Sequence, residues 1–292
     1  MPDESSVAKG AASRPWVILG CGRLGRALAI TAESLGVEIC ASWNRRESTA
    51  REVGRELSTG ENLYGELPGA LAEVELEGAV VWVTVVDDAV RDVACRVADA
   101  VSEAHLVLHA CGSLGASVLR EAGVEAPVGS LHPLLAVTDP AAAADRFGEC
   151  AWTVEGGDEA SAFASWFTGA LGAELVELKQ GTRPLYHASA ATAANLVVAL
   201  FDAALEMATL AGLQRDQARR MLLPLLQSSV DNLREQSTAE ALSGPAARGD
   251  DGTIERHRRA LADAAGPLGD IYDALTSRAL ELGADSSEHD PE

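Results

Sequence analysis

The sequence is poor in positive charge, and this shortage excludes whole classes of partner. It holds 23 lysine and arginine residues against 44 aspartate and glutamate residues, which gives a formal net charge of −21. Nucleic acids and anionic membrane surfaces would be repelled by this charge, so we expect neither as a partner. An anionic cofactor would need a local cluster of cations. The N-terminal part of the chain has one, made of Arg23, Arg26, Arg45 and Arg46.

Cysteine is also scarce. The five cysteines are scattered, and no two of them form a C-x-x-C pair. A disulfide framework or a structural zinc site needs paired cysteines, so we expect reduced thiols, a cytoplasmic location and no metal. The first residues, MPDESS, are acidic and polar, unlike a secretory signal, so we expect none. Residues 1–14 and 284–292 are polar enough that we expect them to be disordered.

The remaining pattern indicates two domains, and 292 residues are enough for two hydrophobic cores. Apolar runs predict strands at 16–19, 37–43, 79–86, 105–109 and 127–131, and residues 151–178 predict a further strand, helix and strand. From residue 184 on, the pattern predicts only helices, across 186–211, 214–242 and 253–282. We therefore predict an α/β fold: a Rossmann-type, mostly parallel sheet in residues 15–180, followed by an all-helical substrate and dimerisation domain in residues 181–283.

The long helix predicted at 186–211 has little polar surface. Asn195, Asp202 and Glu206 lie within it and would be costly in lipid, so we expect no membrane span. A soluble helix of this kind is buried in a helical core or in a subunit interface. We therefore predict a homodimer formed through the helical domain.

The most informative segment is a short apolar strand that leads directly into a G-x-G-x-x-G motif and a helix. In a dinucleotide-binding fold, Gly20 permits the tight turn, Gly22 leaves room for a pyrophosphate, and Gly25 lets the helix pack close to the strand. A glycine-rich turn in another α/β protein is the alternative. The cofactor-binding residues expected in this segment are Gly20, Cys21, Gly22, Arg23, Leu24 and Gly25.

The end of the second predicted strand indicates which dinucleotide is bound. Proteins that bind NAD usually carry an acidic residue there for the ribose hydroxyls, but this strand ends in Asn44, Arg45 and Arg46. The planar fork of an arginine suits a 2′-phosphate, so we predict NADP as the cofactor. The alternative is that these arginines are only solvated surface residues.

Residues at the carboxyl ends of the following strands are expected to border the same cofactor. Val86 ends the third of these strands, and Ser113 follows the fourth, although a turn or capping role is the alternative for Ser113. His132 precedes Pro133 at the end of the fifth strand, where it could face the nicotinamide or could shape the turn before the proline.

The order of these parts resembles the superfamily that contains ketopantoate reductase, pyrroline-5-carboxylate reductase and the β-hydroxyacid dehydrogenases. More closely, the chain resembles a bacterial group of Rossmann-like NADP oxidoreductases whose helical half is a domain of unknown function. The resemblance covers nearly the whole chain. It rests on the glycine motif, Val85-Val-Asp-Asp88, His109-Ala-Cys-Gly-Ser113, Ser130-Leu-His-Pro133, Tyr186-His-Ala188 with Asn195, and Ser243-Gly-Pro-Ala-Ala-Arg-Gly-Asp250.

The sequence departs from this superfamily at one catalytic position. The β-hydroxyacid dehydrogenases carry a lysine one turn before an asparagine, and if that asparagine is Asn195, the lysine position holds Ala191. His187 lies eight residues before Asn195, about two helical turns, so we expect both on one face. His187 could then donate a proton to the substrate, with Asn195 polarising it, or His187 could only pack or cap at the start of the helix.

A long loop between the predicted helices supplies the candidate substrate-binding residues. Two glycines flank Arg248, which suggests a guanidinium presented to a substrate carboxylate, and Ser243 opens the same loop. The loop is longer than helix connections usually are. The alternative is an interhelical turn with a solvated arginine.

Two hypotheses for the function follow. The first is an NADP-dependent oxidoreductase that transfers a hydride to or from a small carbonyl or imine compound, one that carries a carboxylate. The second is a redox sensor or interaction protein that binds NADP without turnover, and the missing lysine is its main support. Turnover of NADPH with pools of oxo acids and cyclic imines would distinguish them.

Overall fold

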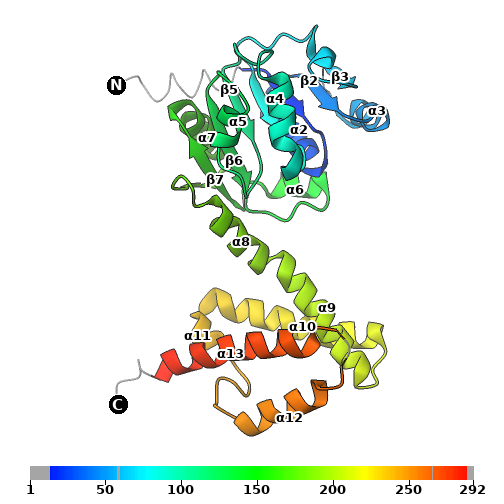
Figure 1. Ribbon diagram of the computed structural model, residues 1–292, viewed down its shortest axis with the longest axis vertical. Helices are drawn as coiled ribbons and strands as arrows, with labels where there is room; N and C mark the ends of the chain where they lie inside the picture. The colour runs from blue at the N-terminus through cyan, green and yellow to red at the C-terminus, as the bar shows by residue number, and fades with distance from the viewer. Residues whose placement is uncertain (1–13, 58–59, 265, 288–292) are drawn as a thin grey trace. The chain divides into compact units, whose positions relative to one another are not determined.

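The computed structural model describes residues 14–57, 60–264 and 266–287, and it divides into two compact units between Ala191 and Thr192 (Figure 1). The first unit is an eight-stranded sheet with helices on both faces. The second unit contains only helices among its described residues. The fold class predicted from the sequence is therefore confirmed.

The sheet has the strand order β3-β2-β1-β4-β5-β6-β7-β8. All strands from β1 to β6 are parallel, whereas β7 pairs with β6 in the antiparallel direction and β8 runs parallel to β7. The order 3-2-1-4-5-6 is that of a dinucleotide-binding sheet, in which the ligand binds across the carboxyl ends of β1 and β4, where the direction of winding reverses. The strands are β1 (Trp16–Leu19), β2 (Ile39–Asn44), β3 (Glu61–Tyr64), β4 (Val80–Val83), β5 (Leu106–His109), β6 (Val128–Pro133), β7 (Ala151–Gly156) and β8 (Glu174–Glu177).

The strands alternate their side chains between two hydrophobic cores. Trp16 and Ile18 of β1 face one core, and Val17 and Leu19 face the other, as the two-residue period of a strand requires. Both faces are covered, so the central strands are buried throughout. The covering helices are α2 (Arg23–Ser34), α3 (Glu47–Glu56), α6 (Pro140–Arg146) and α7 (Asp158–Leu171) on the first face, and α4 (Val90–Val97) and α5 (Ser117–Glu121) on the second.

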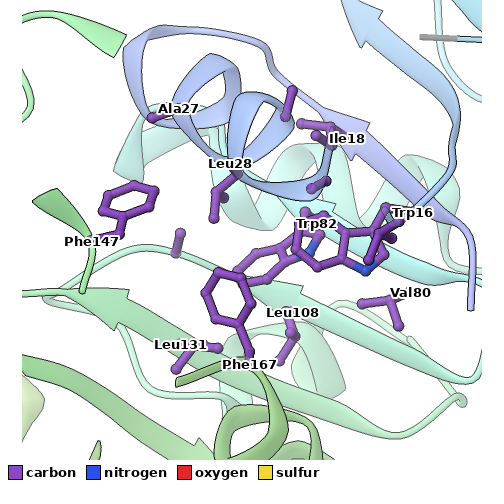
Figure 2. Packing of buried hydrophobic residues seen from close by; sticks show 14 of the residues in the cluster. Trp16, Ile18, Ala27, Leu28, Val80, Trp82, Leu108, Leu131, Phe147 and Phe167 are labelled. Carbon is purple, nitrogen blue, oxygen red and sulfur yellow. The ribbon is translucent and has the colours of Figure 1, made fainter. Parts of the chain in front are cut away.

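Aromatic rings fill the first core. Trp16 and Trp82 lie 5.5 Å apart between ring centroids, and Phe167 of α7 packs within 5.7 Å of Trp16. Figure 2 shows Leu28 of α2 pointing toward this group. These contacts fix α2 against β1 and β4, and thereby fix the glycine-rich turn that joins β1 to α2.

The second unit contains five helices in its described part. They are α9 (Asn195–Leu210), α10 (Arg215–Glu235), α11 (Thr238–Ala241), α12 (Asp251–Leu261) and α13 (Leu268–Ser287). The unit buries few apolar side chains, and several on α9 and α10 are more than half exposed. The single helix predicted at 186–211 is wrong in one respect: α8 (Arg183–Ala193) and α9 are separated at Ala194, whose ψ of −74° departs from a regular helix.

The structure differs from the sequence pattern at three further places. The sequence pattern missed the short strand β3, which has no fully buried residue and contains charged Glu61. The predicted domain boundary at 180/181 precedes the structural division, because residues 183–191 of α8 belong to the sheet unit and Arg183 is fully buried there. Helix α13 continues to Ser287, so residues 284–287 are not part of a disordered tail, while residues 1–13 and 288–292 lie outside the described residues.

The span 183–210 is long and apolar enough to cross a membrane by length and composition. Its first residue argues against this, because Arg183 is fully buried within the sheet unit. Asp202, inside the span, is exposed and pairs with Arg215. A membrane span would have to carry that charge into lipid and detach the buried arginine.

Candidate active site

The glycine-rich turn between β1 and α2 forms the centre of the candidate cofactor site. Gly20 has a φ of +106°, which side-chain-bearing residues rarely adopt, and a Cβ there would overlap the backbone of Val85. A Cβ at Gly25 would stand 2.5 Å from the carbonyl oxygen of Gly20. At Gly22, by contrast, no heavy atom of the described residues lies within 4 Å of a Cβ position. Gly20 and Gly25 are therefore tightly enclosed by the protein, whereas Gly22 is open to solvent.

Helix α2 begins directly at this open position. Gly22 is its N-cap, and no side chain of a described residue caps the helix by a hydrogen bond, so the first amides of α2 have no capping partner there. Such a helix start attracts a phosphate. Arg23 is exposed beside it, whereas the side chains of Cys21 and Leu24 turn into the first core and leave only their backbones for a ligand.

A cleft of about 390 Å³ opens next to the glycine-rich turn. Its lining comes from the ends of β1, β2 and β4 and from α4, which is the adenosine side of a dinucleotide site in this topology. Val86, 75% exposed, lies on its rim. The lining residues are Gly20, Gly22, Trp43, Arg45, Gly65, Glu66, Leu67, Thr84, Val85, Val86, Ala89, Asp92, Val93 and Arg96.

The structure separates the four arginines that the sequence grouped together. The guanidinium of Arg26 forms ion pairs within the protein, with Glu52 at 2.9 Å and with Glu56 at 2.7 Å, so it is not available to a ligand. Arg45 lines the cleft and has no ion-pair partner among the described residues. Arg46 is the exposed N-cap residue of α3 and does not line the cleft. Arg45 is therefore the cation that the cleft presents to a ligand.

A second arginine in the cleft, Arg96, was missed by the sequence reasoning. Arg96 forms ion pairs with Glu66 at 2.9 Å and with Asp92 at 3.0 Å. Its charge is therefore neutralised, and Arg96 contributes to the wall of the cleft more than to its positive charge. Asn44, at the end of β2, is 5% exposed, and its side-chain nitrogen has no hydrogen-bond partner among the described residues. A buried donor without a partner is costly, so a ligand that satisfied it would gain from doing so.

The loop after β5 is shaped by a buried histidine. The His109 ring accepts a hydrogen bond from the Cys111 amide on Nδ1 and donates from Nε2 to the carbonyl oxygen of Gly115. Burial lowers the pKa of His109 to about 4, so the ring is neutral. At the tip of the loop, the Ser113 hydroxyl donates to Asp87 Oδ2 at 3.0 Å. The loop thus joins the carboxyl ends of β4 and β5.

Three rings gather at the neighbouring end of β6. His132 Nδ1 lies 3.2 Å from the Tyr186 hydroxyl, and the His132 and His187 rings meet edge to face with centroids 5.9 Å apart. A Cβ at Gly112 would overlap both histidines, so the loop after β5 closes over them. His187 Nδ1 is buried without a hydrogen-bond partner among the described residues. This ring cluster, His132, Tyr186 and His187, joins two predicted candidates with Tyr186, which the sequence indicated only through a family resemblance.

The protonation state of His132 follows from its surroundings. Burial is the main cause that lowers the pKa of His132 to about 4, and the charges of Arg183 and His187 lower it further. At neutral pH His132 is therefore an uncharged ring that can hold the Tyr186 hydroxyl, and it is a poor source of protons.

The residue that holds this cluster in place was not foreseen. Arg183 begins α8, is fully buried, and lies 3.3 Å through Nε from Glu155 Oε2 of β7. The pair joins distant segments of the chain, and no local pattern around Arg183 marks it as buried.

Three predicted residues lie in the other unit. Asn195 begins α9 after the interruption at Ala194, is exposed, and lies beyond the division between the two units, so the shared face expected for His187 and Asn195 stays a prediction. Ser243 lines a mostly apolar cavity of about 350 Å³ between α9, α12 and α13. Arg248 is exposed and has no ion-pair partner among the described residues. Asp250 from the same loop caps α12 by accepting from the Thr253 amide at 2.9 Å.

The fold and the glycine-rich turn define a Rossmann-type fold with a helical second unit. Residues 150–279 match the model of a domain family of unknown function, DUF2520. No curated protein was found to be similar in sequence.

Solved structures share this architecture along nearly the whole chain. A Bacteroides fragilis protein named as an NADP oxidoreductase is 24% identical with a TM-score of 0.75, and covers 93% of this chain and 99% of its own. An imine reductase from Streptomyces aurantiacus is 16% identical with a TM-score of 0.63, at 93% and 96% coverage. The pyrroline carboxylate reductase of Plasmodium falciparum, solved with NADP bound, is 14% identical with a TM-score of 0.57, at 93% and 99% coverage. The resemblance predicted from the sequence is confirmed for the fold.

Proposed function

We propose that this protein is an NADP-dependent oxidoreductase that transfers a hydride to or from a small carbonyl or imine compound. One observation carries the proposal. In the order of its strands, the carboxyl edge of one sheet presents an arginine without an ion-pair partner among the described residues, an open glycine-rich turn and a cluster of proton-bearing rings. β6, which carries His132, lies three strands from β1. At roughly 4.8 Å per strand, the rings stand about 14 Å along the edge from the turn.

The residues of the cleft fit NADP. Gly22 and the start of α2 would hold the pyrophosphate, and Arg45 would bond the 2′-phosphate. Asn44 precedes Arg45 and does not line the cleft itself, and we propose that its buried nitrogen donates to the same ligand. NADP is also the cofactor named for the Bacteroides protein and bound in the Plasmodium reductase. When bound, NADPH supplies the hydride, so the protein has to supply a proton and a defined substrate position.

The ring cluster would supply the proton. Hydride addition to a carbonyl or imine carbon leaves a negative oxygen or nitrogen, which needs a proton from a nearby donor. Between the two candidate histidines, His187 is the better donor, because its buried Nδ1 has no protein partner among the described residues and His132 is held uncharged. His132 and Tyr186 would then orient the substrate atom beside His187 through the Tyr186 hydroxyl.

The helical unit would bind the substrate and form the dimer. Arg248 is free to take a substrate carboxylate, with Ser243 in the same loop, and Asn195 would polarise the reacting group. Apolar side chains on α9 and α10 are too exposed for an isolated unit, as Val198 at 71% and Leu225 at 64% show. A second copy of this chain is the occupant that we propose for this apolar surface, in a symmetric homodimer.

A substrate screen tests the function. Purified protein is incubated with NADPH and pools of 2-oxo acids, 3-oxo acids and cyclic imines, and NADPH oxidation is followed by absorbance. Turnover with one pool, and none with NADH at the same concentration, supports the proposal. Tight NADPH binding by calorimetry without turnover in any pool would instead favour a redox sensor. Lack of binding to either cofactor would refute the nucleotide site.

A further inference from the structure

Arg183 is an unusual residue for the start of a helix, because its guanidinium is entirely enclosed. It donates to three backbone carbonyl oxygens, those of Ser130 at 3.1 Å, Thr153 at 3.3 Å and Cys111 at 3.5 Å. These oxygens belong to β6, to β7 and to the loop after β5. One side chain therefore fastens α8 to three segments at the carboxyl edge of the sheet.

The counter-charge is also buried and fixed. Glu155 of β7 is 9% exposed, and its Oε1 accepts a hydrogen bond from the Ala116 amide at 3.1 Å, while Oε2 faces Arg183 Nε. A buried ion pair of this kind is not explained by stability, because well-packed apolar residues of the same volume are often equally stable or more so. What such a pair supplies is a unique arrangement.

That arrangement concerns the ring cluster. Tyr186 and His187 stand three and four residues after Arg183, and this spacing puts all three on one face of α8. The anchor on Arg183 thus sets the height and rotation at which Tyr186 and His187 meet His132.

The charge of Arg183 reaches His132 as well. The charged or titratable groups around the His132 ring are Arg183, Tyr186 and His187 of α8, His109 of β5, and Asp87 after β4. Arg183, His187 and His109 disfavour a proton on His132, and Asp87 favours one. Apart from burial, the largest of these effects comes from Arg183.

We propose that Arg183, held by Glu155, is a positioning residue that sets Tyr186 and His187 against His132. As a second effect, the charge of Arg183 disfavours a proton on the His132 ring, which burial already keeps uncharged at neutral pH. Its role in the reaction rests on the proposed function, but its two structural effects do not. They exist in the free protein and can be measured without cofactor or turnover.

The test is an NMR titration of the histidine rings, with the His132 signals assigned by their loss in His132→Gln. The double variant Arg183→Gln/Glu155→Gln removes both charges and leaves a neutral amide at each position. Because a charge at close range shifts a pKa by about 1 or more, the midpoint of His132 should rise by about 1 in this variant. Arg183→Lys keeps the charge but lacks the planar fork that reaches several carbonyl oxygens. In Arg183→Lys the midpoint should stay low, while the nuclear Overhauser contacts of His132 with the Tyr186 and His187 rings weaken.

Each result bears on the proposal. A folded double variant with an unchanged His132 midpoint would overturn the electrostatic part, and unchanged ring contacts in Arg183→Lys would overturn the positioning part. If the double variant does not fold, Arg183→Lys still decides the positioning part, and the apolar pair Arg183→Met/Glu155→Leu, which also removes both charges, decides the electrostatic part. Expected midpoints and contacts in a protein that turns over no substrate would mean that the proposed reaction is wrong and this inference is right.

Discussion

Replacing Arg45 with alanine tests the cofactor assignment most directly. Arg45 lines the cleft beside the glycine-rich turn and has no ion-pair partner among the described residues, so its removal breaks no salt bridge there. A charge-assisted hydrogen bond contributes about 1.5–3 kcal/mol. At about 1.4 kcal/mol for each tenfold change, NADPH should bind about 10- to 150-fold more weakly. NADH, which lacks the 2′-phosphate, should lose little affinity.

The neighbouring arginine provides a matched control. Arg46 has the same charge and is exposed, but it caps α3 and lies outside the cleft. Calorimetric titration of wild-type protein, Arg45→Ala and Arg46→Ala with NADPH and NADH gives six dissociation constants. Equal losses for both cofactors in Arg45→Ala, or the same selective loss in Arg46→Ala, would refute the assignment of Arg45 to the 2′-phosphate.

Four further outcomes are expected. Gly22→Val should abolish NADPH binding in calorimetry with an unchanged Tm, because its side chain would enter open space that a pyrophosphate needs; retained binding contradicts the site. With a substrate from the screen, His187→Ala should lower kcat by about 10²–10⁴-fold and keep cofactor affinity, and near-wild-type kcat would move the proton donor elsewhere. Sedimentation should show a dimer that Val198→Glu converts to a monomer, whereas a monomeric wild-type protein at micromolar concentration would rule out the proposed assembly. The pKa of His109 is about 4 in the native state and 6.5 in the unfolded chain, so between these pH values the unfolded state binds more protons than the native state. The free energy of unfolding therefore decreases as the pH falls from 6.5 toward 4. This loss, about 3 kcal/mol from His109, should be smaller in urea unfolding of His109→Asn, and equal losses in both proteins would show that the ring is not buried neutral.

Local sequence was sufficient for the elements around the cofactor site. The glycine-rich turn, β1 and α2 follow from a continuous apolar run, three glycines and a helical pattern within one short segment, 16–34. Each of these signals acts between neighbouring residues, so it is present in the sequence without knowledge of the fold. The central strands and the helical second half were predicted for the same reason.

Only the tertiary structure decided how the other candidate residues combine. It separated Arg45 from Arg26, because Arg26 finds Glu52 and Glu56 on another helix. Through the register of β6 and the packing of α8, it joined His132 to Tyr186, 54 residues later in the chain. The burial of Arg183 depends on a carboxylate and three carbonyl oxygens from other segments, and none of them is near it in sequence. Pairings of this kind arise from strand order and helix docking, which local periodicity does not contain.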